Sequence, residues 1–192
     1  APDAGNMEIL IEYGTPEQQK QFLMPLLNGD TRSCFSMTEP HFAGSNPTMM
    51  GTTALKEGEE YVINGHKWFT SNGEIADYFF IMAVTDRDVH PYSGTSIFIA
   101  PRDTPGINIT RDVPTMGLKD FGGHVEIKYE NVRLPANAVL GELGQGFSIA
   151  QVRLAPARLT HCMRWTGIAQ RALEIATQYA SEREAFGKKL IE

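Results

Sequence analysis

Short apolar or alternating runs, separated by Gly, Asn, Asp and Pro, follow one another from residue 32 to residue 140 and restrict the possible folds more than any other feature. Runs of this length with this punctuation are typical of antiparallel strands. The segments expected to form strands are 61–63, 67–70, 78–84, 96–100, 107–111 and 125–129. Between the first two, Asn64-Gly65 is a strong signal for a two-residue hairpin. This succession of short strands and turns predicts a small barrel or sandwich of seven or eight strands.

A helical pattern precedes the strand region. Residues 15–18, Thr-Pro-Glu-Gln, have the order of a capping box with proline at the first helical position. Asn28-Gly29-Asp30 supplies a stop, so a short helix is expected between these two signals. Its apolar face is expected to contain Phe22, Leu23, Leu26 and Leu27.

A second helical pattern follows Gly141. Apolar residues recur at helical spacing from Phe147 onward, and the helix is expected to run to Gly187 with a kink or break at Pro156. The expected fold class is therefore α+β, an antiparallel β-barrel or sandwich flanked by helices. The expected division is residues 1–31, the end of an N-terminal helical domain, 32–140, a middle β-barrel domain, and 141–192, the start of a C-terminal helical domain. The apolar face of the last helix needs a partner from further residues or another subunit, which indicates a piece of a longer protein.

The composition argues against several classes of function. A net charge of −6 without a cluster of Lys or Arg opposes nucleic acid or an anionic membrane as the main partner, since both bind dense positive charge. The longest apolar run, about residues 79–84, falls far short of the ~20 residues that span a bilayer. A soluble globular protein is expected. The N-terminus starts no signal peptide, so the compartment stays unknown: cytoplasmic in a bacterium, mitochondrial or peroxisomal in a eukaryote.

Metal and disulfide chemistry have little support in the sequence. Cys34 and Cys162 lie far apart, so neither a disulfide framework nor a C-x-x-C motif is available. The five histidines have no metal-ligand spacing, which argues against a protein-held metal. Gly141, Gly144 and Gly146 lack the G-x-G-x-x-G spacing and the βαβ context of a dinucleotide loop, so they are interpreted as a turn into the following helix.

Three other segments contain the residue types that a flavin site requires. They are residues 37–40 (Met-Thr-Glu-Pro), 66–73 (His-Lys-Trp-Phe-Thr-Ser-Asn-Gly) and 183–187 (Arg-Glu-Ala-Phe-Gly). An isoalloxazine ring needs an apolar wall, hydrogen-bond donors at N5 and at the pyrimidine edge, and donors for the pyrophosphate. Taken alone, residues 67–71 are also ordinary strand composition. The order of the three segments along the chain is what favours a flavin site.

In this order the three segments, and the chain from end to end, resemble the acyl-CoA dehydrogenase family. Residues 64–73 are similar to the family motif N-G-x-K-x-[WF]-I-[ST]-N-G, whose aromatic residue packs beside the flavin and whose hydroxyl bonds N5. Residues 35–40 resemble the strand that contacts the flavin edge, and residues 43–45 resemble the loop that approaches the pyrophosphate and the substrate's CoA. The resemblance implies that FAD is bound by Met37, Thr38, Gly44, Ser45, Phe69 and Ser71, with Ser45 also touching CoA.

The C-terminal segment adds a substrate contact and a subunit contact to the resemblance. Residues 145–147 followed by Arg158 look like the start of the family's C-terminal domain, where the matching arginine helps to place the CoA thioester. A solvated helix charge is the alternative for Arg158. Residues 182–187 resemble E-R-x-x-F-G, which implies that Arg183 and Phe186 reach the FAD of a neighbouring subunit, the arginine through paired bonds to phosphate. A homodimer or homotetramer is implied.

Some details depart from the usual family pattern. The loop 38–46 is one residue longer than T-E-P-G-A-G-S-D and ends in Asn46, and Ala155 stands where an acidic residue is common. Ala157 stands at the glutamate position of the members that carry the base on this helix. Family members are considerably longer, and the part beyond usually supplies the base, so the catalytic residue is unknown. Residues 153–158 and 161–164 look most like the subclass fused in animals to a phosphotransferase-like kinase domain.

The resemblance implies an enzyme that oxidises an acyl-CoA thioester to trans-2-enoyl-CoA, by abstraction of the α-proton and transfer of the β-hydride to flavin N5. An electron-transfer flavoprotein is the implied acceptor. Five acidic residues are considered as the base and none matches it: Glu39, Glu142, Glu174, Glu182 and Glu184. The isolated chain is therefore expected to be poorly active. Two alternatives stay open: a flavin-dependent acyl-CoA oxidase or monooxygenase on the same scaffold, and a cofactor-free β-domain that serves assembly.

Overall fold

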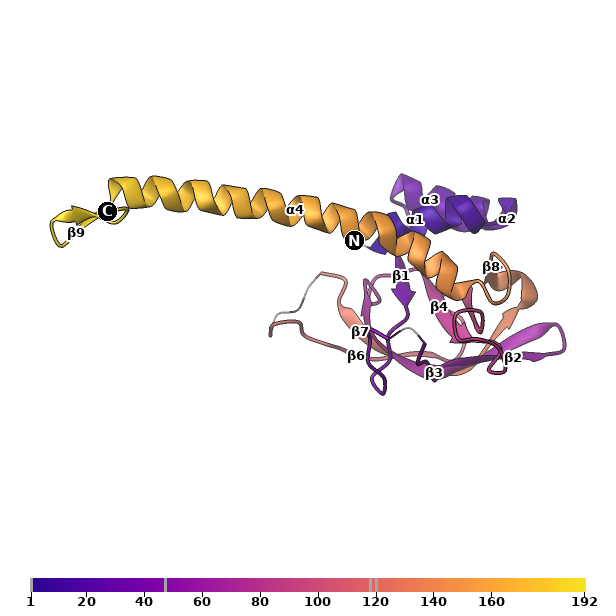
Figure 1. Ribbon diagram of the computed structural model, residues 1–192. Helices are drawn as coiled ribbons and strands as arrows, with labels where there is room; N and C mark the ends of the chain where they lie inside the picture. The colour runs from indigo at the N-terminus through magenta and orange to yellow at the C-terminus, as the bar shows by residue number, and fades with distance from the viewer. Residues whose placement is uncertain (1, 47, 118, 120) are drawn as a thin grey trace. The chain divides into compact units, whose positions relative to one another are not determined.

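The computed structural model describes residues 2–46, 48–117, 119 and 121–192 (Figure 1). The chain divides into two compact units with the boundary between Arg153 and Leu154. Within the first unit, strands form one mixed sheet. The strands are β1 (Ser33–Ser36), β2 (Thr53–Glu57), β3 (Glu60–Ser71), β4 (Tyr78–Val84), β5 (Thr95–Pro101), β6 (Ile107–Asp112), β7 (His124–Pro135) and β8 (Val139–Leu140). The α+β fold class expected from the sequence is confirmed.

The strands are arranged in the order β6-β7-β3-β2-β4-β5-β8, and β1 pairs with β4 outside this path. Most neighbours are antiparallel, as expected, but β1 is parallel to β4, and β2 meets β4 in parallel at Thr53 and Val84. The parallel pairing of β1 brings the chain from the N-terminal helices directly onto β4. The segment that follows Ser36 then leaves the sheet toward β3, which is the start of the candidate site.

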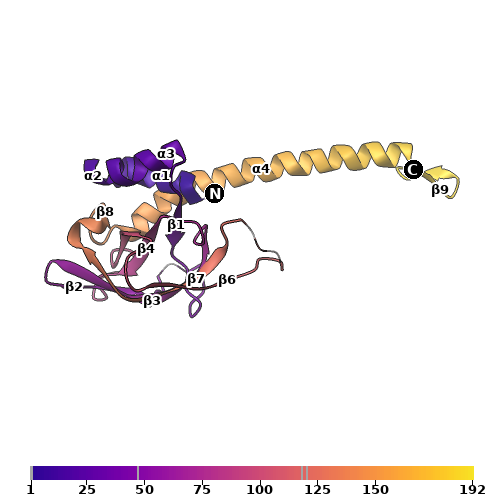
Figure 2. The same cartoon turned by 180° about the vertical axis from the view of Figure 1, so that it is seen from behind.

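The N-terminal helices are α1 (Pro2–Tyr13), α2 (Pro16–Gln18), a π-helical turn (Gln19–Leu23) and α3 (Met24–Asn28), and they lie together on one side of the sheet (Figures 1 and 2). The predicted capping box is confirmed: Gln18 N–H donates to Thr15 Oγ1 at 3.2 Å, and Thr15 N–H donates to Gln18 Oε1 at 3.1 Å. Gly29 ends α3 with φ 81°. The predicted apolar face is wrong in one position, because Leu27 is exposed while Leu23 and Leu26 are buried.

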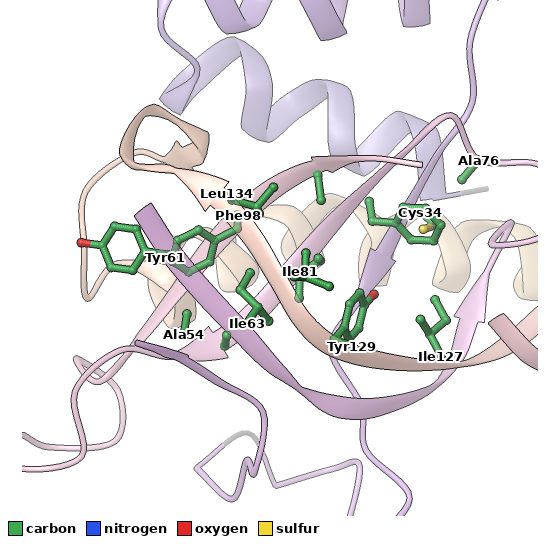
Figure 3. Close-up of a cluster of buried hydrophobic side chains, with 14 of the residues drawn as sticks. Cys34, Ala54, Tyr61, Ile63, Ala76, Ile81, Phe98, Ile127, Tyr129 and Leu134 are labelled. Atoms are coloured by element: carbon green, nitrogen blue, oxygen red, sulfur yellow. The ribbon is translucent and has the colours of Figure 1, made fainter. Parts of the chain in front are cut away.

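Two apolar clusters hold the first unit together. Alternate residues of β4 point to opposite sides: Phe79, Ile81 and Ala83 enter the cluster inside the sheet, shown in part in Figure 3, and Tyr78, Phe80 and Met82 enter the cluster beneath the helices. Burial of both faces explains why β4 is continuously apolar. A fully buried side chain of this size contributes ~1.5–3 kcal/mol relative to an exposed one.

The predicted hairpin at Asn64-Gly65 is wrong. The structure has one continuous strand β3 there, with a register shift in its pairing to β7 between Ile63 and Gly65. The hairpin lies earlier in the chain, between β2 and β3. Glu57 pairs with Glu60 there, and Gly58 in the turn has φ 63°. Gly65 has a different reason to be glycine: a Cβ there would lie 2.2 Å from Thr52 Oγ1.

Helix α4 (Gly146–Glu182) begins after a turn, as expected from the glycines before it. Its first residues belong to the first unit, where Ile149 and Ala150 are buried. The predicted break at Pro156 is wrong, since α4 continues through this residue without interruption. The predicted end at Gly187 is also wrong: the helix ends at Glu182, and the chain forms a small hairpin of β9 (Glu184–Ala185) and β10 (Lys188–Lys189). Over the described residues, every helix is too short or too polar to cross a membrane.

Candidate functional site

The segment after β1 is bonded to the middle of β3. Trp68 N–H donates to Thr38 O at 3.0 Å, and Thr38 Oγ1 donates to Trp68 O at 2.8 Å. These two bonds join the Met-Thr-Glu-Pro segment to the Trp-Phe-Thr-Ser segment, which lie about thirty residues apart in the chain. The structure therefore brings together two of the three segments that the sequence singled out.

A buried ion pair stabilises the junction between these two segments. Lys67 has a fully buried side chain, and its Nζ donates to Met37 O at 2.8 Å and to Glu39 Oε1 at 2.9 Å. Glu39 also accepts hydrogen bonds from Gly51 N–H at 2.7 Å and Thr52 N–H at 2.9 Å. A buried charge is tolerated only with a partner and hydrogen bonds, and both ions have them here. The carboxylate of Glu39 is thus committed to holding the loop.

The titration of this pair follows from burial and mutual attraction. Burial acts to raise the pKa of Glu39, but the Lys67 ammonium and the hydrogen bonds from Thr52 and Lys67 outweigh it and hold the pKa below its ordinary value. Burial lowers the pKa of Lys67 to about 8, with Glu39 opposing the change. Sequence reasoning missed this pair. The signal that could have found it is a lysine at the start of the otherwise uncharged strand run 67–70.

Phe69 and Ser71 lie at the end of β3, just beyond the junction. A second register shift between Lys67 and Thr70 leaves Phe69 at φ 50°, with 43% of its surface exposed. A large apolar ring at positive φ and in solvent is uncommon, and such strain often marks a functional position. Ser71 Oγ lies 2.8 Å from His124 Nδ1 on β7. The end of β3 therefore presents the ring of Phe69 and the hydroxyl of Ser71 close together in sequence, and His124 contacts the hydroxyl.

The loop after Pro40 lies against the same segment. A Cβ on Gly44 would lie 3.3 Å from Thr38 Cγ2, so glycine allows the loop backbone to approach closely. The ring of Phe42, in this loop, lies 3.0 Å from the position of a Cβ on Gly51. Ser45 is exposed. A small hollow here is lined by Met37, Thr38, Glu39, Phe42, Ala43, Gly44, Asn46, Met49 and Met50.

The remaining candidates belong to the second unit and are described only within it. Arg183 is exposed after the end of α4, where its N–H donates to Tyr179 O at 2.8 Å and its carbonyl accepts from Leu190 N–H at 3.0 Å. Phe186 forms the tip of the β9–β10 hairpin at φ 55° and is fully exposed. Arg158 is an exposed residue of α4. The tip of a hairpin is a suitable place for an aromatic side chain that contacts another molecule.

Three of the carboxylates considered as bases have hydrogen-bond partners in the structure. Glu39 is tied to Lys67, while Glu174 and Glu182 accept hydrogen bonds at 3.0 Å from glutamines four residues earlier on α4. Within the described residues, no three His, Cys, Asp or Glu side chains gather in a way that could hold a metal ion.

The donor set on the first unit fits a flavin. An exposed aromatic ring at Phe69 can cover an apolar face, and the hydroxyl of Ser71 can bond a ring nitrogen. The strained backbone of Phe69 and the close approach of Gly44 to Thr38 are the structural observations behind this fit. Backbone strain of the kind seen at Phe69 clusters at ligand sites.

Comparison with known proteins agrees with this chemistry. The family model "Acyl-CoA dehydrogenase, middle domain" matches residues 34–132, and "Acyl-CoA dehydrogenase, C-terminal domain" matches residues 144–192. The first match contains the candidate contacts Met37, Thr38, Gly44, Ser45, Phe69 and Ser71. The second contains Arg158, Arg183 and Phe186.

Individual relatives are similar over nearly the whole chain. "Probable acyl-CoA dehydrogenase FadE2" of Mycobacterium tuberculosis is 48% identical over 100% of this chain and 48% of the relative. "Acyl-CoA dehydrogenase family member 11" of Gallus gallus is 47% identical over 99% of this chain and 25% of the relative. The solved structure of a putative acyl-CoA dehydrogenase from Mycobacterium abscessus is 47% identical with a TM-score of 0.93, covering 100% of this chain and 48% of that one. The chain thus spans about half or less of the length of these proteins.

Proposed function

This chain belongs to the acyl-CoA dehydrogenase family, and from that premise we propose that it supplies the flavin platform of an enzyme that oxidises acyl-CoA thioesters. The proposed reaction converts the thioester to trans-2-enoyl-CoA, with FAD as the hydride acceptor. The observation that carries the proposal is the junction of Thr38 and Trp68, which sets Met37 and Thr38 beside Phe69 and Ser71 on the end of β3.

Each proposed FAD contact has a distinct task. Phe69 covers a face of the isoalloxazine ring, Ser71 bonds N5, and the backbone and side chains of Met37 and Thr38 meet the flavin edge. Gly44 and Ser45 approach the pyrophosphate, and the absence of a side chain at Gly44 avoids a tight contact, since a Cβ there would lie 3.3 Å from Thr38 Cγ2. When bound, FAD would accept the hydride, and the chain's residues would orient the ring and exclude water from one side of it.

We further propose contacts that involve other parts of the assembly. Ser45 and Arg158 bind the CoA portion of the substrate, and Arg183 and Phe186 reach the FAD of a neighbouring subunit in a homodimer or homotetramer. The exposure of Phe186 at a hairpin tip supports its part. An electron-transfer flavoprotein is the proposed acceptor. We also propose that the chain is divided into helical, β and helical domains at residues 1–31, 32–140 and 141–192.

The proton-abstracting base is proposed to come from outside these residues. The two helix positions where the family places acidic groups near the substrate arginine are Ala155 and Ala157, which have no ionisable side chain. Glu39 is bound to Lys67 and cannot leave it without stranding a buried ammonium. This chain by itself is therefore expected to turn over acyl-CoA poorly, which a normal rate from a preparation of the mass of 192 residues would contradict.

An anaerobic visible spectrum, recorded before and after a panel of acyl-CoAs is added, tests the proposal. A flavin spectrum that bleaches with one chain-length class supports the dehydrogenase half-reaction and identifies the substrate. Rapid formation of peroxide after oxygen is admitted would favour the alternative of an acyl-CoA oxidase. A colourless protein that fails to take up added FAD in its full-length form would leave the β-domain as an assembly module and overturn the proposal.

A further inference from the structure

His124 lies directly opposite Ser71 in the pairing of β7 with β3, and its Nδ1 atom is 2.8 Å from Ser71 Oγ. The backbone is fixed around both residues. His124 N–H donates to Asp112 Oδ1 at 2.7 Å, and Asn72 N–H donates to Gly123 O at 2.9 Å. Ser71 and His124 are therefore a cross-strand pair with backbone hydrogen bonds on both sides. None of the roles proposed above uses His124.

The polarity of this hydrogen bond decides what Ser71 can offer to a ligand. A serine hydroxyl has one hydrogen and two lone pairs, and an imidazole nitrogen donates only when it carries a hydrogen. If Nδ1 carries the hydrogen, His124 donates and the hydroxyl hydrogen of Ser71 is available for another acceptor. If Nδ1 is bare, Ser71 donates to it and presents only lone pairs elsewhere.

We propose that His124 is a positioning residue that fixes the Ser71 side chain and sets whether its hydroxyl presents a hydrogen or a lone pair to the candidate flavin site. This inference rests on the proposed function, in which Ser71 contacts N5. That nitrogen is an acceptor in oxidised flavin and carries a hydrogen in reduced flavin. A hydroxyl that can either donate or accept a hydrogen bond therefore matches both oxidation states. Imidazolium has hydrogen on both nitrogens, so a protonated His124 holds Ser71 as a donor toward the site.

Other ionisable groups surround the pair, and the structure gives them partners. Glu126 on β7 is held by Arg111 and His66, and Glu74 is paired with Lys119 at 2.8 Å. Among the described residues, the titratable and charged groups on the elements packed around His124 are Asp3, His66, Glu74, Arg111, Asp112, Lys119 and Glu126. All of them are retained in the Ser71→Ala variant, which removes only the hydroxyl that contacts His124, so its difference from the wild type reports on the Ser71–His124 contact.

Nitrogen-15 NMR of the imidazole rings in the full-length protein tests the contact without relying on flavin. Ser71→Ala is expected to change the tautomer ratio and the titration curve of His124, while the curve of His66 stays in place. Identical His124 curves in the wild type and Ser71→Ala would overturn the inference. His66 is a suitable internal reference because it lies on the same strand as Ser71 and bonds Glu126 at 2.7 Å.

The midpoint potential of bound FAD, measured against pH, provides the second readout. The wild type is expected to show an inflection at the pKa that NMR gives for His124, and His124→Asn, which keeps a polar group of similar reach, is expected to lose it. His66→Gln should retain the inflection. An inflection that survives in His124→Asn would overturn the inference. If the wild type takes up no FAD, the proposed function fails, and the NMR comparison still decides the role of His124.

Discussion

Lys67 and Glu39 form an ion pair in the interior of the sheet, with 2.9 Å between Nζ and Oε1 and no exposed surface on the lysine side chain. The pair joins the start of the candidate loop to the strand that carries Phe69 and Ser71. Because Lys67 also bonds Met37 O, one side chain sets the position of the segment proposed to meet the flavin edge. Stability and the candidate site therefore depend on the same residue.

Replacing Lys67 with methionine should be strongly destabilising, because the carboxylate of Glu39 stays buried without its counterion. Loss of one partner of a buried pair costs ~3–5 kcal/mol. The double variant Lys67→Met/Glu39→Gln should recover part of this loss, since no uncompensated charge remains. Urea unfolding measures the free energy of unfolding of both variants. Lys128→Met, at an exposed position, is the control, and its stability is expected to lie within about 0.5 kcal/mol of the wild type. Equal stability of Lys67→Met and Lys128→Met would contradict the prediction.

The stabilisation from Glu39 should disappear in acid. Its pKa is below the ordinary value of 4.5, so the unfolded chain binds the proton first as the pH falls. The contribution is complete above pH 4.5 and is lost as the pH falls through the folded-state pKa. Lys67, with a pKa of about 8, stays protonated throughout this window. The difference in unfolding free energy between the wild type and Glu39→Gln should shrink from neutral pH to about pH 3; a constant difference would refute the assignment.

Gly65→Ala should destabilise the sheet, because the new Cβ would lie 2.2 Å from Thr52 Oγ1 and 2.5 Å from Thr52 Cβ. Overpacking of this kind costs ~1–3 kcal/mol or more. Thr52→Gly in the same chain should cancel much of the added cost, and a double-mutant cycle by thermal unfolding measures the coupling. Gly167→Ala is the matched control, since nothing lies within 4 Å of its Cβ, and helix propensity predicts a gain of ~0.5–1 kcal/mol. Additive effects of Gly65→Ala and Thr52→Gly would argue against the close approach.

Phe69→Ala should weaken FAD binding while changing stability little. The ring is 43% exposed, so its removal costs less than about 1 kcal/mol of folding free energy. Covering such a ring with a ligand is worth ~1.5–3 kcal/mol, which predicts a loss of affinity of about tenfold to a hundredfold. Fluorescence titration of the apoprotein with FAD measures this, with Leu55→Ala, another exposed apolar residue of the sheet, as the control. Unchanged affinity in Phe69→Ala would remove this residue from the site.

The sequence by itself was sufficient for the features that depend on local chemistry. The capping box at Thr15 and Gln18, the stop at Gly29 and the turn into α4 follow from contacts within a few residues. The strand at residues 78–84 could be recognised from its continuous apolar run. The motifs at residues 37–40 and 64–73 also identified the family, because their residue types and order are a property of the chain alone.

Tertiary structure decided what depends on contacts between distant segments. The signal at Asn64-Gly65 was interpreted as a hairpin, but packing against Thr52 makes glycine necessary within a continuous strand. The pairing of Lys67 with Glu39 and of Ser71 with His124 could not be predicted, since they join residues 28 and 53 positions apart. Local propensity describes what a segment favours alone, whereas register, close approach and the partner of a buried charge are fixed only when the strands meet.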